Sequence, residues 1–260
     1  MPGGRTNRLW RFGPQAGGLV CKLFDPTAAS PMFPNDINAE VSALRALAGT
    51  GLAPCLERVI STAEGHCLVY GHVDGTPLTA KLSTVAGTLR RLHRIAPPDG
   101  LRRLPRQPEA ILLLGDRIAS DLSAPHRARL HATRPPLPRA DMGLPVFVHG
   151  DAVPANILYD GESICLIDWQ CPAIGDATED LATFLSPAMQ SVYAGAPLEP
   201  QAETEFLEAY GDAAATARYR ELAPLFHWRM AAHCLWKAAR GDPDYAEAAE
   251  LELSRLATGE

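Results

Sequence analysis

The sequence lacks any long uninterrupted run of apolar residues. A membrane-spanning helix needs about 20 such residues, and no segment of the 260-residue chain approaches that length. The first residues carry arginine but no apolar stretch, so we expect no secretory signal. These two absences predict a cytoplasmic protein without a membrane partner.

An excess of positive charge is also missing. The chain has 30 acidic and 24 basic residues, which gives a formal net charge of −6. Nucleic acids bind strongly basic surfaces, so we expect no nucleic-acid partner. Hydrophobic residues make up 47% of the chain, the share of a folded globular protein rather than a disordered one. The length allows one large domain or two smaller ones; the sequence sets no oligomeric state.

Two residue types are sparse in an informative way. The six cysteines are scattered and include no C-x-x-C pair, a pattern that favours reduced thiols over disulfides or a zinc site. Lysine accounts for only three of the 24 basic residues, namely Lys22, Lys81 and Lys237. Because arginine cannot replace a compact ammonium group at every site, each lysine is a candidate for a specific role.

The apolar pattern divides the chain into a β-rich first part and a mainly helical second part. Strands are expected at 9–12, 19–24 and 66–70, with a helix capped by Asn35 or Asp36 between the last two. Beyond them, we expect helices at 82–92, at 109–122 and from 179 onward, with short strands at 146–148, 156–160 and 163–168. The composition changes near 74–79, which predicts lobes at 1–74 and 75–260.

Three oxygen-bearing side chains lie around the short strands. Asp151 falls in the turn after 146–148, Asn156 follows five residues later, and Asp168 ends the apolar run at 163–168. Such residues are common in turns. They are also the ligands of Mg²⁺, which completes its shell with water and phosphate oxygens.

The segment H-G-D-x-x-x-x-N, followed by a strand ending in I-D-W, resembles the aminoglycoside phosphotransferase and choline kinase family, relatives of the protein kinases. The resemblance spans about residues 3–186 and includes GGRTN, LVCK, TLRRLH and GDATEDLATFL. It implies an α+β, bilobal protein-kinase-like fold with a small β-rich N-lobe and a larger, mainly helical C-lobe. A typical member has a full strand before GGRTN, so we expect that strand to be missing or to precede the stated start.

The resemblance implies an ATP- and Mg²⁺-dependent kinase. Asp151 would be the general base for the acceptor hydroxyl, and Asn156 and Asp168 would hold Mg²⁺. Lys22 would bind the ATP phosphates while Glu40 fixes it. Other nucleotide contacts are expected from Thr6, Asn7, Val20, Tyr70, Gly71, His72 and Val73. Supporting roles near the catalytic loop are expected for His149, Asp176 and Asp180.

The acceptor is a small hydroxylated molecule that the resemblance leaves open. GGRTN favours choline, ethanolamine or thiamine, whereas Gln170 stands where choline kinases more often have an acid. Candidate acceptor contacts are Trp169, Gln170, Trp228 and Arg229. The spacing of Trp228 in an aromatic stripe also suits a core helix. The alternatives are an aminoglycoside O-phosphotransferase, whose site should be strongly acidic, and a non-catalytic nucleotide-binding regulator.

Overall fold

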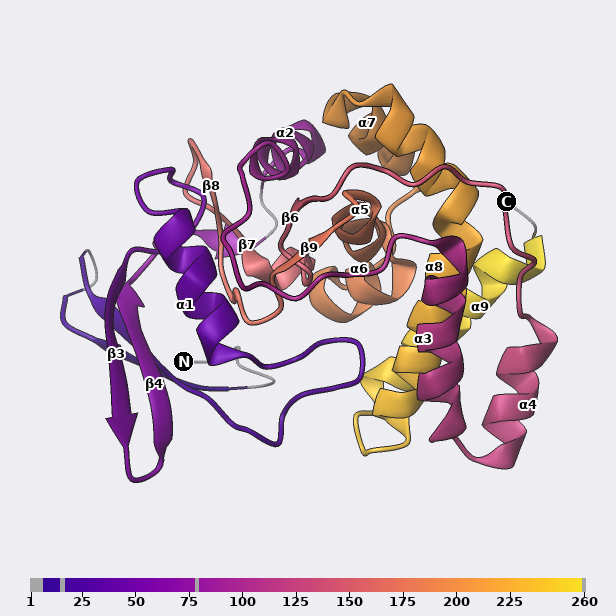
Figure 1. The fold of residues 1–260 in the computed structure, drawn as a ribbon, viewed down its shortest axis with the longest axis horizontal. Coiled ribbons are helices and arrows are strands. Elements are labelled where there is room, and N and C mark those ends of the chain that lie inside the picture. The colour runs from indigo at the N-terminus through magenta and orange to yellow at the C-terminus, as the bar shows by residue number, and fades with distance from the viewer. Residues whose placement is uncertain (1–6, 15–16, 78–79, 259–260) are drawn as a thin grey trace.

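The computed structural model describes residues 7–14, 17–77 and 80–258. It is a mixed α+β structure, with an antiparallel sheet near the N-terminus and a helical C-terminal part (Figure 1). Within the described ranges, no helix is long and apolar enough to cross a membrane.

The N-terminal sheet has four antiparallel strands in the order β1-β2-β4-β3. The strands are β1 (Arg8–Phe12), β2 (Leu19–Leu23), β3 (Leu56–Thr62) and β4 (Gly65–Gly71). Three of them lie where the sequence predicts strands, but β3 was not predicted. It is an edge strand whose side chains are almost all exposed, so its sequence lacks the apolar alternation of a half-buried strand.

Helix α1 (Ile37–Ala46) packs against this sheet beside β3 and β4 (Figure 1). Its N-cap is Asp36, whose carboxylate accepts hydrogen bonds from the N–H groups of Asn38 and Ala39 at 2.8 and 3.2 Å. Leu44 is buried on the sheet side, together with Glu40. A helix capped at this position was predicted, and its buried face also carries a charged residue.

Short strands lie between the sheet and the helices. β5 (Thr76–Pro77), β7 (Ile157–Tyr159) and β8 (Ile164–Leu166) form one small sheet, and β6 (Val146–Val148) pairs with β9 (Ala173–Gly175). The single-turn helix η1 (Pro154–Asn156) precedes β7. The N–H of Leu166 in β8 donates to the carbonyl of Leu52 at 2.9 Å, which ties this small sheet to the N-terminal part.

The C-terminal part is a group of helices around one long helix. They are α2 (Leu82–Leu92), α3 (Pro108–Ser120), α4 (Ala124–Ala132), α5 (Thr178–Leu185), α6 (Pro187–Ala194), α7 (Pro200–Tyr210), α8 (Ala213–Ala238) and α9 (Asp244–Thr258). α8 packs against α3, α5 and α9. A Cβ at Gly115 of α3 would overlap the indole of Trp228 in α8, so glycine permits this close contact.

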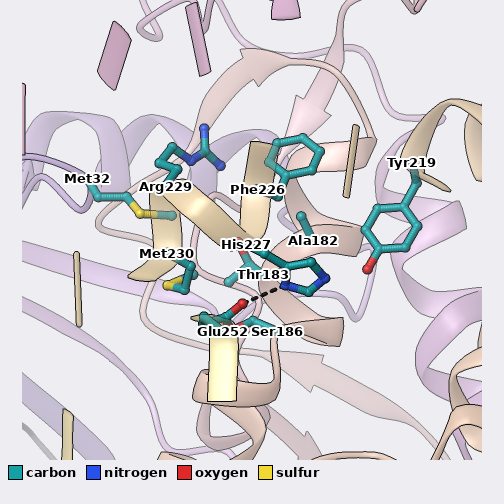
Figure 2. Close-up of a pocket in the computed structure, with 10 residues that line it drawn as sticks. All are labelled: Met32, Ala182, Thr183, Ser186, Tyr219, Phe226, His227, Arg229, Met230 and Glu252. Carbon is teal, nitrogen blue, oxygen red and sulfur yellow. Dashed lines mark hydrogen bonds and ion pairs between the residues drawn. The ribbon is translucent and has the colours of Figure 1, made fainter. Parts of the chain in front are cut away.

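The segment 24–36, between β2 and α1, crosses from the sheet toward the helices α3 and α9 (Figure 1). Met32 is buried in this segment and lines a small pocket with Phe226 and Met230 of α8 (Figure 2). The ring of Phe33 meets that of His233 edge-on, with centroids 5.0 Å apart. The 24–36 segment therefore packs against α8.

Candidate active site

The H-G-D turn follows β6 and has a fixed backbone. Gly150 has a φ of 76°, and a Cβ there would overlap a neighbouring carbonyl group, so the turn requires glycine. The N–H groups of His149 and Gly150 each donate to the carboxylate of Asp180 at 2.8 Å. Asp180 is fully buried in α5, where His93 Nε2 also lies 3.0 Å from it. Asp180 thereby positions the turn that carries Asp151.

His149 also holds the turn that carries Asp151. Its ring is fully buried and lies within 3.0 Å of the Ile167 carbonyl through Nε2, while Nδ1 accepts from the N–H of Asp151 at 3.2 Å. Burial lowers the pKa of His149, and the neutral ring with its proton on Nε2 satisfies both contacts. Trp169 packs on this ring, with centroids 4.3 Å apart.

Asp151 and Asn156 meet because η1 folds the chain back. The Asn156 side-chain nitrogen donates to the Asp151 carbonyl at 2.9 Å and to its carboxylate at 3.2 Å. Burial and, after it, the negative charge of Asp168 together raise the pKa of Asp151 to about 8. The two aspartates therefore lie close enough for their charges to interact.

Asp168 follows β8 at a sharp turn. Its φ of 63° makes it the one non-glycine residue in the left-handed region among those that the structure describes. Aspartate tolerates this conformation better than most residues. The turn brings its carboxylate to Lys22, whose Nζ donates to Asp168 Oδ1.

Lys22 links three elements. It lies in β2 with a side chain only 2% exposed, and its Nζ also donates to Glu40 of α1 at 2.6 Å. Burial opposes the charge of Lys22, but the negative charges of Asp168 and Glu40 outweigh this effect and raise its pKa. Burial raises the pKa of Glu40 to about 7, although the positive charge of Lys22 acts to lower it. Each charge in this group therefore depends on its partners.

Asn156 and Asp168 have the donor chemistry for Mg²⁺. The nitrogen of the Asn156 amide faces Asp151, which leaves the amide oxygen for another partner, and Lys22 bonds one oxygen of Asp168. Across the described ranges, no three His, Cys, Asp or Glu side chains cluster as a metal site. A cation here would therefore also need water or phosphate oxygens, as Mg²⁺ does in phosphate sites.

Four of the predicted nucleotide contacts lie in or directly after the strands β2 and β4. Val20 and Tyr70 are buried and lie opposite each other in the β2–β4 ladder. The N–H of Gly71 bonds the Cys55 carbonyl at 2.9 Å, and the N–H of His72 bonds the Gly18 carbonyl at 2.7 Å. These two N–H groups already donate to carbonyls of the protein. Of the predicted backbone donors at 70–73, they are therefore not available to a base.

Asn7 and Thr6 have different outcomes. Thr6 lies outside the described residues. The Asn7 side chain is buried and donates to Gln170 at 2.8 Å and to Asn35 at 3.0 Å. Its side-chain oxygen accepts from the N–H of Asp25 at 3.0 Å. Asn7 thus joins the start of the sheet to the segment after β8, a contact that the prediction of a phosphate ligand did not include.

Asp176 lies in a separate ion pair. Its carboxylate accepts from Arg218 at 2.7 and 2.8 Å, and from the N–H groups of Gly143 and Thr178 at 3.0 Å each. Burial opposes its ionisation, but the hydrogen bonds from Arg218 and Thr178 outweigh burial and lower the pKa of Asp176. It fastens the 133–145 loop to α8, and its predicted role beside the catalytic loop stays a prediction.

The two tryptophans proposed as acceptor contacts are enclosed in the core. Trp169 is fully buried and donates from Nε1 to the Leu166 carbonyl at 2.7 Å. Trp228 is also fully buried and donates to the Leu130 carbonyl at 2.8 Å. Neither indole has a face open to a ligand. Trp228 therefore belongs to the core, as the spacing of its helix suggested, and Trp169 is also a core residue.

Arg229 is held by a partner and lines a different pocket from Asp151. Its guanidinium forms two hydrogen bonds to Glu179, at 2.6 and 3.2 Å. In Figure 2 this guanidinium points away from a buried pair in which His227 Nδ1 lies 2.6 Å from Glu252. Asp151 does not line this pocket. The structure therefore places Arg229 in a different pocket from Asp151.

A hollow opens beside Asp151, between the 24–36 segment and the helices α6, α8 and α9. We call it the Asp151 hollow. Its lining residues are Ala28, Ser30, Phe33, Asp151, Gln170, Met189, Tyr193, His233, Lys237 and Tyr245. Among the four acceptor candidates, only Gln170 lines it.

Most residues of the Asp151 hollow were not predicted from the sequence. They come from segments far apart in the chain, and only the fold brings them together. Two signals point to part of the set. Lys237 is one of three lysines, and His233 precedes it by four residues, which puts both on one side of a helix.

The fold is that of the protein-kinase-like phosphotransferases. The chain belongs to the phosphotransferase enzyme family (APH), whose sequence model matches residues 1–225. It is thus an enzyme of the small-molecule kinase type. No curated protein matches the sequence.

Solved structures with the same fold differ in their acceptors. The GDP complex of aminoglycoside 2′-phosphotransferase-IIIa has a TM-score of 0.67 at 17% identity, over 100% of this chain and 92% of that one. Choline kinase from Cryptosporidium parvum Iowa II has a TM-score of 0.66 at 16% identity, over 99% and 87%. Spectinomycin phosphotransferase with ADP and spectinomycin has 0.59 at 18% identity, over 97% and 87%. The shared fold therefore does not determine the acceptor.

Proposed function

We propose that the protein transfers the γ-phosphate of ATP to a hydroxyl group of a small metabolite. One observation carries the proposal: the charged group of Lys22, Glu40 and Asp168 lies beside Asp151, and Asp151 lines an open hollow. Phosphoryl transfer depends mainly on positioning and on neutralising negative charge. This arrangement provides cationic and oxygen groups for phosphates on one side and room for an acceptor on the other.

At the phosphate end, Lys22 would exchange its contact with Asp168 for the α- and β-phosphates of ATP. Glu40 would keep Lys22 charged and in place. Asn156 and Asp168 would hold Mg²⁺, which when bound supplies positive charge to the phosphates and aligns the γ-phosphoryl group. Val20 and Tyr70 would pack against the base, which lies between lobes that we place at 1–74 and 75–260. The N–H of Val73 is the backbone donor in 70–73 that would reach the base.

Asp151 would orient the acceptor hydroxyl and, in its ionised form, take the hydroxyl proton as general base; its pKa of about 8 lies near the pH at which such a base works best. A bond forms between the hydroxyl oxygen and the γ-phosphorus, and the bond from that phosphorus to the β–γ bridging oxygen breaks, so that ADP leaves. The Asn156 amide and the turn anchored by Asp180 would keep the Asp151 carboxylate in line with this reaction. Because the reaction uses ATP and all six thiols are free, we also propose a cytoplasmic location.

Choline-, ethanolamine- or thiamine-like molecules are the acceptors that the GGRTN resemblance favours. A second candidate is an aminoglycoside, because structural neighbours include aminoglycoside and spectinomycin phosphotransferases. The charged residues that line the Asp151 hollow are one acid, Asp151, and one base, Lys237. This balance counts against the strongly acidic site that a polycationic antibiotic needs. The presence of Lys22, Glu40, Asp151, Asn156 and Asp168 counts against a non-catalytic regulator.

ADP release with a panel of acceptors tests the proposal. The panel contains choline, ethanolamine, thiamine, an aminoglycoside, sugars and small hydroxy acids, each with ATP and Mg²⁺. We expect acceptor-dependent ADP release, and a phosphorylated product in the mass spectrum, from the wild-type protein but not from Asp151→Asn. Equal rates in the two proteins would refute the role of Asp151. Folded wild-type protein that releases no ADP with any acceptor would refute the proposed function.

A further inference from the structure

The Asp151 hollow contains a cation that belongs to the protein. Lys237 of α8 has its Nζ 5.3 Å from the centroid of the Tyr245 ring and 3.3 Å from a carboxylate oxygen of Asp242. Lys237 and Tyr245 both line the hollow, and the Lys237 side chain is 28% exposed. The ammonium group is therefore accessible from the hollow and already lies over an aromatic face.

This position matters for the charge of the acceptor. Quaternary ammonium ligands bind over aromatic faces through cation–π contacts. In the Asp151 hollow, one such face is already taken by Lys237. A cationic acceptor would also lie next to a like charge, which is unfavourable. The aromatic lining by itself would suit choline, but the lysine opposes it.

Apart from Asp242, which does not line the hollow, the residue beside Lys237 on α8 is uncharged. His233 is 3% exposed, and burial, followed by the positive charges of Lys237 and Arg229, lowers its pKa to about 3. Its ring is therefore neutral near pH 7. The His233 Nδ1 atom is buried, and no described residue gives it a hydrogen-bond partner. Such unsatisfied polar atoms are rare in folded proteins and call for an explanation.

We infer that the acceptor is an anionic hydroxylated metabolite, a hydroxy acid, whose hydroxyl meets Asp151 and whose carboxylate binds Lys237 beside His233. The inference rests on the proposed phosphotransfer and adds the charge of the acceptor to it. Asp242 holds Lys237 in the absence of acceptor and shares it with the carboxylate on binding. Both side chains of this ion pair are partly open to solvent, so the pair costs little to rearrange.

The kinetic test compares hydroxy acids with their neutral methyl esters and with a cationic alcohol. ADP release is measured with glycerate, 3-hydroxybutyrate and gluconate, with the methyl ester of each acid, and with choline. For the wild-type protein, we expect kcat/KM at least ten-fold higher for the best acid than for its ester or for choline. A preference for the ester or for choline would overturn the inference and leave the phosphotransfer intact.

Variants of the ion pair separate a ligand role from a structural one. Lys237→Gln should raise KM for the acid about ten-fold or more, with little change in kcat and no change for the ester. Asp242→Asn should leave KM for the acid unchanged or lower it, because the lysine is then freer to bind a carboxylate. Lys81→Gln, an exposed lysine at the start of α2, is the matched control and should behave like the wild type. If both pair variants weaken all acceptors equally, the pair is structural and the inference is wrong.

A binding measurement keeps the inference testable without turnover. The melting temperature is measured with each acid or ester at millimolar concentration, without ATP. We expect at least one acid, and not its ester, to raise the melting temperature of the wild type but not of Lys237→Gln. An acid that binds in this way without any ADP release would refute the phosphotransfer and support the charge assignment. No difference between acids and esters in either measurement would refute the charge assignment.

Discussion

The proposed phosphate end and the proposed acceptor end of the site each contain one lysine, and the two lysines have different surroundings. Lys22 is 2% exposed between Glu40 and Asp168, whereas Lys237 is 28% exposed and pairs with Asp242. Removing one partner from a buried pair leaves a costly uncompensated charge, while an exposed pair contributes little to stability. The phosphate end is thus fixed by its charges, and the acceptor end can exchange partners. The predictions below test this contrast, beginning with the largest effect.

Asp151 belongs to both ends, so its replacement should have the largest effect on activity. Asp151→Asn keeps the size of the side chain and its place beside Asn156 but removes the general base. We expect kcat to fall by about 10²–10⁴-fold, the usual contribution of general acid–base catalysis. ADP release with the best acceptor of the panel measures this.

The matched control for this variant is Asp160→Asn. Asp160 lies in the exposed turn between β7 and β8, where it binds N–H groups of Glu162 and Ser163. We expect its replacement to leave kcat within about two-fold of the wild type. Equal losses in the two variants would show that general damage to the β7–β8 region, rather than loss of a base, lowers the rate.

At the phosphate end, Lys22→Met should weaken the fold as well as the activity. It leaves Glu40 and Asp168 buried or half-buried without their cation, and we expect a loss of about 3–5 kcal/mol in the free energy of unfolding. Urea denaturation measures it. In the double variant Lys22→Met/Glu40→Gln, one of the stranded acids is gone, so the loss should be smaller than the sum of the two single losses. Additive losses would mean that the two residues do not depend on each other.

His233 should make the free energy of unfolding depend on pH below about 6.5. Its pKa is about 3 in the folded protein and about 6.5 in an unfolded chain. Between these values only the unfolded state binds the proton, so unfolding becomes easier as the pH falls, by up to about 1.4 kcal/mol per pH unit. Urea denaturation from pH 6.5 to pH 4 should show a shallower dependence for His233→Phe. Identical slopes would mean that the histidine titrates alike in both states.

The partly exposed pair of Lys237 and Asp242 should matter least for folding. We expect Lys237→Gln to change the free energy of unfolding by less than about 1 kcal/mol, because solvent reaches this partly exposed ion pair and screens it. Its effect should appear in the KM of the acceptor instead. A loss as large as that of Lys22→Met would abolish the contrast between the two ends.

The two ends also differ in how far the sequence predicts them. Asp151, Asn156 and Asp168 lie within 18 positions of one another on consecutive short elements, so local spacing is enough to relate them. The prediction for Lys22 and Glu40 rested on the resemblance of the LVCK strand, and of the helix after it, to the family's pattern. The Asp151 hollow instead combines residues from the 24–36 segment, α6, α8 and α9. No local pattern relates such residues, because their proximity depends on how the helices pack.

The missed elements of the fold have a related cause. In β3 almost every side chain is exposed, and in α4 only Leu130 is buried. Neither segment therefore has the periodic apolar face from which strands and helices are predicted. The buried positions of Trp169 and Asn7 depend on contacts with Phe147 and Gln170 respectively. Such contacts, rather than residue type, decided whether these side chains face a ligand or the core.

The melting temperature with and without Mg²⁺-ATP tests the central claim most directly, because it needs no acceptor. A ligand at 100 times its Kd adds about 2.7 kcal/mol to the stability of the folded protein, which corresponds to a rise of roughly 5–10 °C for a chain of this size. We predict such a rise for the wild-type protein, and little or none for Lys22→Met. No rise in the wild type, or an equal rise in both proteins, would contradict the assignment of this group of residues to ATP.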